Sequence, residues 1–366
     1  MKVVFELNHP AHFHLFKNTA FSLEKNGHEI AFVVKEKDVL LNLIRKCSIE
    51  AVVYSRTSHE KKKGFIGNLL WLIESDIKFF NFCRKFKPDI MLGSNFSFTH
   101  IGKLMGIPTL LWAEDDAKEV ILGAKISYPF ATTLFAPVSC NNYKWENKSI
   151  KYPGYHELAY LHPNHFNPEI RFIEKYIDTT KPYYLLRFSK LTAHHDSGKS
   201  GITSDLAQKL INILNPHGTV YITSEGELES QFETYRLSID PQNIHHAMYF
   251  ADIYIGDSQT MAAEAAVLGT PSFRFNDFVG KLGYLNELEN KYNLTYGIKT
   301  NHPQVLVEKI SRLLENDKLK KEWITRRENM LVEKIDVAEF MTWVVENYPH
   351  SIQTIKNNPE YQYNLK

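Results

Sequence analysis

Cysteine is scarce in this sequence of 366 residues, which contains three: Cys47, Cys83 and Cys140. They lie far apart and show no C-x-x-C spacing, which excludes a disulfide framework and a zinc knuckle. Long hydrophobic runs are also missing, since no apolar stretch approaches the ~18 residues that a membrane helix needs. At the N-terminus an acid and a turn come too early for the apolar core of a signal peptide. We therefore expect a cytoplasmic protein.

A strong charge of either sign is absent as well. The formal net charge is +1 at pH 7, which argues against general nucleic-acid binding. The first 150 residues carry five more basic than acidic side chains, and the remainder carries four more acidic ones. This asymmetry suits an anionic substrate or membrane surface for the first half, and it also suits ordinary scatter of surface charge.

Short β-rich segments alternate with helical patterns along the chain, whose length suits two domains of roughly 150 to 190 residues. This alternation is typical of βαβ units and predicts mostly parallel sheets. The strand-like segments are KVVFEL, EIAFVV, AVVY, DIMLG, TLLWA and TLFAPV in the first half, and YYLLRF, TVYIT, IYIGD and PSFRF in the second.

The alternation lapses in the Pro-, His- and Tyr-rich stretch YPGYHELAYLHPNHFNP. Such a stretch is typical of a linker, so we place a domain boundary near residues 155–170. The prediction is an N-terminal domain at 1–160, a second domain at 161–345 and a C-terminal tail at 346–366.

A basic and apolar segment, RTSHEKKKGFIGNLLWLIESDIKFFNF, supports two interpretations. Its lysines, Lys61 to Lys63, and its apolar side chains suit contact with an anionic bilayer that presents a lipid-linked acceptor. Alternatively the helix packs on the sheet, in which case its buried stripe is expected to contain Ile66, Leu70, Ile73, Ile77 and Phe80.

The stretch ADIYIGDSQTMAAEAAVLGTP, residues 251–271, carries the clearest binding signal. A buried strand runs through Gly256 into small polar residues and then an Ala-rich helix. Such a turn directs backbone N–H groups and the positive end of the helix dipole at a ligand, which suits a phosphate. Ser258 and Thr260 are then phosphate contacts, and Glu264 is an accessible carboxylate for ribose hydroxyls. A capped helix with a solvated Glu264 fits the same residues.

Five motifs in order and spacing give the chain a wider resemblance: NHPAHFHLFKN, GHEIAFVVKEKD, YPGYHELAYLHP, LLRFSKLTAHHDSGKSGI and HHAMYFADIYIGDSQTMAAEAAVLGTP. Over roughly residues 1–345 the sequence resembles a microbial family of unknown function within the superfamily of GT-B glycosyltransferases and UDP-GlcNAc 2-epimerases. The resemblance implies an α/β fold of two Rossmann-type parallel-sheet domains facing a central cleft. It also implies a nucleotide-sugar substrate, with UDP expected as the nucleotide, and no cofactor or bound metal.

The same resemblance assigns a donor site to the second domain. Ser258, Gln259 and Thr260 become diphosphate contacts, and Glu264 becomes the ribose contact. The stretch LLRFSKLTAHHDSGKSG adds Arg187, Ser189 and Lys190, of which Arg187 is suited to neutralising a diphosphate. An exposed loop is the alternative for this stretch.

The opening motif NHPAHFHLF contains three histidines that are candidates for a functional site. Related enzymes place a Gly-rich loop that ends in His after the first strand, and His12 matches that position. We expect His12 to act as the base for an acceptor hydroxyl or as a donor to a phosphate or sugar. His9 and His14 are expected to satisfy the turn or to pack on the first helix. Pro10 and Ala11 stand where glycines are usual, which disfavours close approach of a phosphate to this backbone.

Acidic residues follow the strand TLLWA, where ligands of parallel sheets collect. Glu114, Asp115 and Asp116 are candidates for action on a sugar, and capping of the next helix by a carboxylate is the alternative. Epimerases carry an acid in the turn that corresponds to GSNFS, where this chain has Asn95.

Together these features predict a glycosyltransferase-like protein that moves a sugar from a nucleotide sugar to a glycan or lipid-linked acceptor, as in cell-surface polysaccharide synthesis. A place at the inner face of the membrane fits this function. The alternatives are an isomerase or hydrolase similar to UDP-GlcNAc 2-epimerases, and a non-catalytic protein that binds nucleotide sugars.

Overall fold

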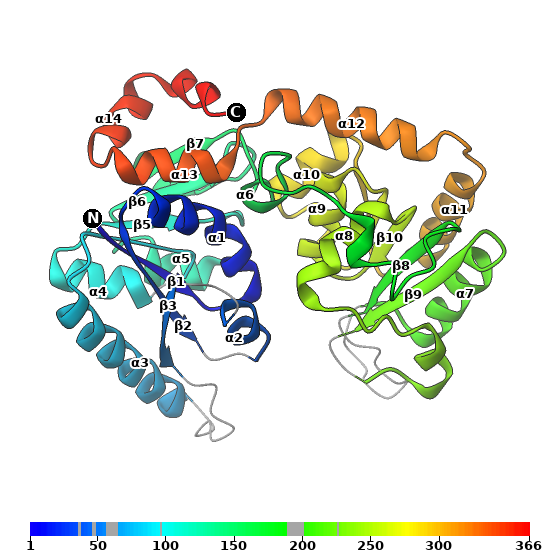
Figure 1. The fold of residues 1–366 in the computed structure, drawn as a ribbon, viewed down its shortest axis with the longest axis horizontal. Coiled ribbons are helices and arrows are strands. Elements are labelled where there is room, and N and C mark those ends of the chain that lie inside the picture. Colours follow the sequence, from blue (N-terminus) through cyan, green and yellow to red (C-terminus); the bar gives the residue numbers. More distant parts are fainter. Residues whose placement is uncertain (36–37, 46–48, 56–64, 96, 189–200, 225–226) are drawn as a thin grey trace. The chain divides into compact units, whose positions relative to one another are not determined.

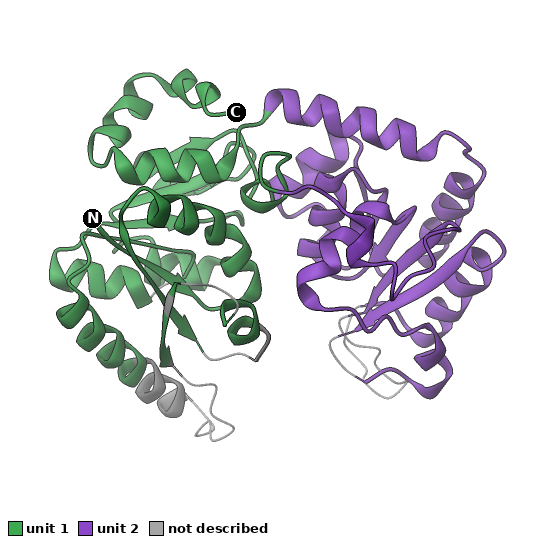
Figure 2. Ribbon diagram, in the orientation of Figure 1, with its two compact units in different colours: residues 1–165, 334–366 green, residues 166–333 purple. Residues whose placement is uncertain are grey.

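The structure is a computed structural model that describes residues 1–366 except 36–37, 46–48, 56–64, 96, 189–200 and 225–226 (Figure 1). The chain divides into two compact units (Figure 2). Unit 1 contains residues 1–165 and 334–366, and unit 2 contains residues 166–333.

Unit 1 is built on a parallel sheet of seven strands among the described residues, in the order β3-β2-β1-β4-β5-β6-β7. The central strands of this sheet are nearly continuous apolar runs, because helices cover both of its faces. The strands are β1 (Lys2–Leu7), β2 (Glu29–Lys35), β3 (Glu50–Ser55), β4 (Ile90–Gly93), β5 (Thr109–Trp112), β6 (Thr133–Pro137) and β7 (Ser149–Tyr152).

Alternate residues of these strands face different helices. Val4 belongs to a core cluster with Phe79 of α3 and Phe98 of α4, whereas Phe5 packs against Phe16 of α1 with ring centroids 5.5 Å apart. Helices α3, α4 and α5 therefore cover one face, and α1 lies on the other with α6 and α13 (Figure 1). The helices are α1 (Pro10–Lys25), α2 (Asp38–Ile44), α3 (Phe65–Phe86), α4 (Ser97–Met105), α5 (Ile121–Ser127), α6 (Leu158–Leu161), α13 (Val337–Glu346) and α14 (His350–Asn357), with shorter 3-10 turns η1 (Tyr143–Lys148) and η5 (Pro359–Asn364).

Unit 2 has a parallel sheet of five strands in the part that the structure describes, in the order β12-β11-β10-β8-β9. One face packs on α7 and α11 through residues such as Leu186, Ile255 and Phe273, and α9 packs on β10 and β11. The elements are β8 (Tyr183–Phe188), α7 (Ser204–Leu214), β9 (Thr219–Ser224), α8 (Ile244–Phe250), β10 (Ile253–Gly256), α9 (Gln259–Leu268), β11 (Ser272–Phe275), α10 (Gly283–Asn290), β12 (Thr295–Ile298), α11 (Pro303–Leu314) and α12 (Leu319–Glu333), with 3-10 turns η2 (Ile170–Phe172), η3 (Ser230–Tyr235) and η4 (Pro241–Asn243).

The predicted buried stripe of α3 is wrong at two positions. Ile73 is 48% exposed and Ile77 is 54% exposed, whereas Phe79 and Cys83 are fully buried. Phe79 and Cys83 are four residues apart on one face of the helix, and this is the face that packs on the sheet. Phe80 packs partly on the same core, and the side chains of Ile66 and Leu70, like Lys61 to Lys63, lie outside the described residues. No helix in the described ranges combines the length and hydropathy needed to span a bilayer.

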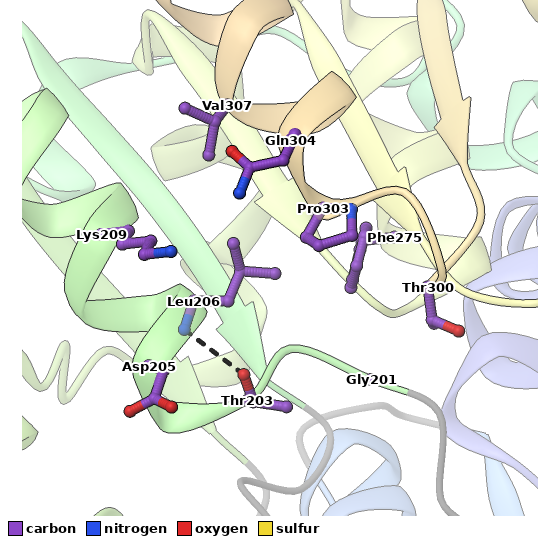
Figure 3. Close-up of a pocket in the computed structure, with 10 residues that line it drawn as sticks. All are labelled: Gly201, Thr203, Asp205, Leu206, Lys209, Phe275, Thr300, Pro303, Gln304 and Val307. Carbon is purple, nitrogen blue, oxygen red and sulfur yellow. Dashed lines mark hydrogen bonds between the residues drawn. The ribbon is translucent and has the colours of Figure 1, made fainter.

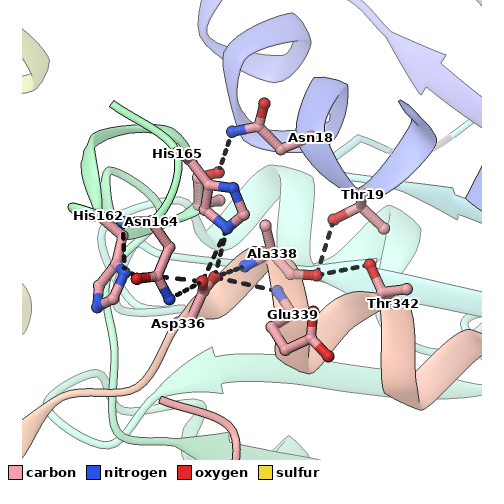
Figure 4. Close-up of polar contacts among 10 residues, drawn as sticks. Asn18, Thr19, His162, Asn164, His165, Asp336, Ala338, Glu339 and Thr342 are labelled. Atoms are coloured by element: carbon pink, nitrogen blue, oxygen red, sulfur yellow. Dashed lines mark hydrogen bonds and ion pairs between the residues drawn. The ribbon is translucent and has the colours of Figure 1, made fainter. Parts of the chain in front are cut away.

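Asp336 joins the two segments at which the chain leaves and re-enters unit 1 (Figure 4). Its carboxylate accepts hydrogen bonds from His165 Nε2 at 2.8 Å and Asn164 Nδ2 at 3.0 Å. It also accepts from the backbone N–H groups of Ala338 and Glu339, both at 3.0 Å. Asp336 is 1% exposed, so this set of bonds fixes both crossing segments inside unit 1.

The division differs from the sequence-based domain boundaries at the C-terminus. Residues 334–345 were assigned to the second domain and 346–366 to a separate tail, but residues 334–366 all belong to unit 1. The physical reason is α13, whose Phe340 is fully buried and packs on Trp112 and Phe135 with ring centroids 5.8 and 6.1 Å apart. An apolar helix that completes the core of unit 1 cannot be recognised from local sequence alone.

Candidate functional site

The carboxyl edge of the unit 2 sheet presents two arginines on either side of a glycine. Arg187 of β8 and Arg274 of β11 both pair in register with Gly256 of β10. Arg274 is fully buried, and its Nη2 donates to Glu289 of α10 at 2.7 Å. Burial lowers the pKa of Arg274, and Glu289 opposes that shift. Arg274 therefore belongs to an ion pair that braces α10 against the sheet, and Arg187 is the arginine beside the turn into α9.

Gly256 is required by the side chain two residues before it. A Cβ at Gly256 would lie 2.5 Å from the Tyr254 hydroxyl oxygen and 3.0 Å from Arg187 Cβ. The first distance is shorter than real Cβ contacts and the second is tighter than most of them, so the phenol of Tyr254 occupies the space that any other residue at 256 would fill. The glycine of the motif thus serves side-chain packing at the edge of the sheet.

The turn after β10 opens helix α9 as the sequence predicts for a phosphate site. Ser258 is the N-cap residue, and its hydroxyl accepts from Met261 N at 3.3 Å. Gln259 and Thr260 follow in the first turn, where N–H groups have no acceptor within the helix, and all three side chains are partly exposed. Arg187 lies next to this turn, because Asp257 N bonds to Arg187 O at 3.4 Å. Ser189 and Lys190 lie outside the described residues.

Glu264 is not the accessible carboxylate that the sequence led us to expect. It is 5% exposed, and its Oε1 lies 3.0 Å from Nε2 of His245 on α8, which is 4% exposed. The small side chains around Glu264 let α8 and α9 approach closely, and that approach buries the carboxylate. His245 was missed because a histidine eight residues before the strand carries no signal for a partner on the following helix.

A cavity of about 170 Å³ lies on the α7 and α11 side of unit 2 (Figure 3). Its walls include Gly201, Thr203 and Lys209 near α7, and Thr300 and Gln304 near α11. Gly201 also approaches the Asp257 carboxylate, since a Cβ there would lie 3.2 Å from Asp257 Oδ2. The volume is smaller than that of typical ligand pockets, so this cavity holds at most part of a nucleotide sugar.

In unit 1 the histidine motif lies at the start of α1. His9 is the N-cap residue, whose Nδ1 accepts from Ala11 N at 3.2 Å, and Pro10 is the first residue of the helix. The helix begins so early that the connection from β1 needs no glycine. His14 packs on Tyr160 with ring centroids 5.2 Å apart. His9 therefore satisfies the turn as predicted, whereas His14 is itself a residue of the first helix and packs on α6.

His12 lies in the first turn of α1 with its tautomer set by the backbone. Asn8 N donates to His12 Nδ1 at 3.3 Å, so Nδ1 acts as the acceptor and Nε2 carries the proton of the neutral ring. A neutral His12 is therefore a hydrogen-bond donor at Nε2. Of the two roles predicted for His12, this arrangement fits the donor to a phosphate or sugar better than the base.

Glu114 meets two residues that the sequence analysis did not select. Its Oε1 accepts from His156 N at 2.7 Å, and its Oε2 lies 3.5 Å from His156 Nδ1. Burial and then the neighbouring Glu157 carboxyl raise the pKa of Glu114 well above its usual range. Burial, with a contribution from His12, lowers the pKa of His156 to about 3. At neutral pH His156 is therefore uncharged, and the neighbouring carboxyl of Glu157 opposes the ionisation of Glu114.

Asp115 and Asp116 have separate surroundings. Burial, followed by the charges of Asp116 and Glu119, raises the pKa of Asp115. Asp116 Oδ1 accepts from Asn141 N at 2.9 Å, which fastens the loop after β5 to the loop after β6. Neither residue caps α5, whose N-cap position is Val120 with no side-chain hydrogen bond, so the helix-cap alternative is wrong.

Glu6 is a further ionisable group that sequence reasoning missed. It is fully buried on β1 and accepts a hydrogen bond of 2.8 Å from Tyr54. Burial raises its pKa to about 7, against the lowering effect of its hydrogen bonds with Tyr54 and Asn8. In the sequence Glu6 is a lone polar residue within a predicted buried strand, a signal that was available.

No protein-family model and no curated protein sequence matches this chain. Solved structures match it over nearly its whole length. A UDP-GlcNAc 2-epimerase from Neisseria meningitidis, bound to UDP-GlcNAc, is 13% identical, with a TM-score of 0.63 and coverage of 98% of this chain and 100% of that one. MnaA of S. aureus, in a co-structure with UDP, is 13% identical, with a TM-score of 0.66 and coverage of 98% and 97%. A Streptomyces glycosyltransferase complexed with thymidine diphosphate is 11% identical, with a TM-score of 0.60 and coverage of 94% and 99%.

The chain has the GT-B fold. Two parallel-sheet α/β units, as the sequence predicted, are shared with both glycosyltransferases and UDP-GlcNAc 2-epimerases. Within this GT-B chain the candidate residues form two separate sets. His12 and Glu114 belong to unit 1 with His156 and Glu157, and the group around Arg187 and α9 belongs to unit 2.

Proposed function

We propose that this GT-B chain is a glycosyltransferase that uses a nucleotide-sugar donor. The observation that carries the proposal is the turn from β10 into α9, where Gly256, the Ser258 N-cap and the neighbouring Arg187 form an edge suited to a diphosphate. A helix N-terminus and a guanidinium both favour the charge that develops on a leaving nucleoside diphosphate. No metal or other cofactor is part of the proposal.

In the proposed donor site, Arg187 and the residues Ser258, Gln259 and Thr260 hold the diphosphate. Ser189 and Lys190 extend this set from the β8 to α7 connection. Glu264 remains the proposed ribose contact. Its Oε1 lies 3.0 Å from Nε2 of His245, so the same carboxylate is proposed to contact both His245 and the sugar hydroxyls.

In this proposal the proton of the acceptor hydroxyl passes to the group in unit 1 that contains His12, Glu114, His156 and Glu157. The raised pKa of Glu114 makes its ionised form a stronger base than an ordinary carboxylate, so Glu114 is the proposed acceptor of this proton. His12 donates from Nε2 to a phosphate or sugar oxygen. Asp115 and Asp116 shape the electrostatic field around Glu114, since their charges oppose its ionisation or that of each other.

The finer part of the proposal concerns the acceptor and the place of action. We propose UDP as the nucleotide and a glycan or lipid-linked acceptor of cell-surface polysaccharide synthesis, at the cytoplasmic face of the membrane. The exposed Ile73 and Ile77 of α3 and Leu104 of α4 support contact with lipid. Replacing Ile73 and Ile77 by Lys tests this point: co-sedimentation with anionic liposomes should fall, and unchanged sedimentation would remove the membrane contact.

A thermal-shift panel of UDP-, TDP-, GDP- and CMP-sugars at millimolar concentration tests the donor site. Binding at 100 times Kd stabilises the folded state by about 2.7 kcal/mol, which gives a clear increase in melting temperature. Arg187→Gln should abolish the shift, and Arg171→Gln, at an exposed arginine of unit 2, is the matched control that should keep it. If no nucleotide sugar shifts the melting temperature, the proposed function is wrong.

A second function is favoured by the Glu114 and Glu157 pair. Epimerisation needs a group that removes a proton from carbon, and the buried Glu114, whose pKa is raised beside Glu157, is better suited to this than Asn95. Incubation with UDP-GlcNAc in deuterated water separates the two reactions, because epimerisation introduces deuterium at the second carbon of the sugar and transfer does not. Binding without either reaction would favour the non-catalytic alternative.

A further inference from the structure

We propose that the Tyr254 hydroxyl is a ligand-binding group of the donor site and donates a hydrogen bond to a phosphate oxygen of a nucleoside diphosphate at the N-terminus of α9. This inference rests on the proposed function and adds to it a residue that the sequence analysis had placed only in a buried strand.

The position of the hydroxyl is the first observation. Tyr254 is a residue of β10, yet its hydroxyl oxygen lies beside the place that a Cβ of Gly256 would take, 2.5 Å from it. The phenol therefore extends along the strand to its last residue, directly before the turn that starts α9. Arg187 approaches the same place from β8, with its Cβ 3.0 Å from that point.

The second observation is that this hydroxyl has no hydrogen-bond partner among the described residues, although Tyr254 is fully buried. Leaving a buried hydroxyl unpaired is unfavourable, and such groups in folded proteins call for a partner. This hydroxyl lies near the N-terminus of a helix and next to an arginine, and both favour an anionic oxygen as its hydrogen-bond partner.

The electrostatics keep the phenol in its donor form. Burial raises the pKa of Tyr254 well above its usual range; Arg187 lowers it, while Asp257 and Glu264 raise it. The hydroxyl therefore keeps its proton throughout the neutral range and can donate it in a hydrogen bond without becoming charged.

Because Tyr254 is fully buried, a phosphate reaches its hydroxyl only if a neighbouring side chain moves, and we infer that Gln259 at the start of α9 is that side chain. Gln259 is half-buried, and its Oε1 has no partner within the described part of the chain. Rotation of Gln259 loses no hydrogen bond at that atom, so a phosphate can displace it at little energetic expense.

Tyr254→Phe tests the proposal because it removes one oxygen and keeps the shape of the ring. We expect UDP to bind the variant at least ~10-fold more weakly in calorimetric titration, with a melting temperature equal to or above that of the parent. The matched control is Tyr183→Phe, on β8. The Tyr183 hydroxyl donates to Ala247 O at 2.7 Å, so this variant should lose stability and keep its affinity for UDP.

Each other outcome has a defined meaning. If Tyr254→Phe binds UDP as the parent does, or loses binding only because its melting temperature falls, the hydroxyl is structural and the inference is overturned. Uridine, which lacks phosphate, should bind parent and variant equally, and an equal loss for uridine and UDP would also overturn the assignment to the diphosphate. If the parent binds UDP but the variant shows no change, the proposed function stands without this residue; if the parent binds no nucleotide, both fail.

Discussion

At the scale of single residues, Glu6 illustrates how burial sets chemistry. Its carboxyl has an ordinary pKa of 4.5, and burial raises it to about 7 in the folded chain. The folded state therefore binds more protons than the unfolded state between these two values, and stability falls as pH rises from about 4.5 to 7. The full loss is on the order of 3 kcal/mol.

Glu6→Gln should remove this pH dependence, because an amide stays neutral and can still accept the Tyr54 hydrogen bond. We expect denaturant titrations to show that the variant gains stability relative to the parent as pH rises from 4.5 to 7, with little difference below pH 4.5. Glu29→Gln, at an exposed residue of β2, serves as the control. A constant difference between Glu6→Gln and the parent at all pH values would mean that Glu6 has an ordinary pKa.

Glu264 carries a second prediction at this scale. Since its carboxylate is buried against His245, Glu264→Gln should lower the free energy of unfolding by about 1–3 kcal/mol and should also weaken UDP binding. His245→Gln removes the partner and keeps the carboxylate, so it should lower stability with a smaller effect on affinity. These values come from chemical denaturation and calorimetric titration. A Glu264→Gln variant that loses stability but binds UDP normally would assign Glu264 to the contact with α8 alone.

At the scale of elements, the turn between β10 and α9 depends on the match between Gly256 and Tyr254. Gly256→Ala places a methyl group 2.5 Å from the Tyr254 hydroxyl, so we expect a loss of about 1–3 kcal/mol in the free energy of unfolding. Removing that oxygen relieves the closest contact. The double variant with Tyr254→Phe should therefore recover part of the loss, and a double-mutant cycle measures the coupling. Additive effects would show that the two side chains do not meet.

The ten segments that the sequence predicts as strands are strands, because continuous apolar runs between helical patterns are a strong signal for buried parallel sheets. Among the residues that the structure describes, two strands were missed, β7 and β12. They have four residues each, SIKY and TYGI, and half of their positions are only partly buried. β12 also contains Gly297, which makes room for Arg274: a Cβ there would lie 3.0 Å from Arg274 Nη2. That requirement comes from a neighbouring strand, which local sequence does not reveal.

The candidate site was predictable to a similar extent. Glu114 follows from the rule that ligands collect at the carboxyl edge of parallel sheets, and Arg187 follows from the family resemblance. Their partners were not predictable, because His156 is 42 residues from Glu114 and His245 is 19 residues from Glu264. Only the folded chain brings these pairs together and buries them, and burial is what changes their pKa values and their accessibility.

At the scale of the whole molecule, unit 1 is discontinuous in sequence, and its last segment completes its core. Phe340 of α13 packs on Trp112, Phe135 and Tyr152, and Thr19 of α1 donates to Ala338 O at 3.3 Å. Unit 2, residues 166–333, lies between the two parts of unit 1 in the sequence. Each unit has its own sheet and core, so the two can lose structure separately.

A chain ending at residue 333 should therefore lose structure in unit 1 and keep it in unit 2. Without residues 334–366, the apolar surface around Trp112 and Phe135 is exposed, and His165 and Asn164 lose the carboxylate of Asp336. Hydrogen exchange should become faster across β5, β6 and α1, whereas β8, β10 and α9 keep their protection. UDP should still slow exchange in unit 2 if the donor site lies there. The milder variant Asp336→Ala should lower the stability of unit 1 by about 1–3 kcal/mol, because it leaves buried donors unpaired. Equal acceleration in both units would show that the chain unfolds as one cooperative body, and the assignment of residues 334–366 to a separately stable unit 1 would be wrong.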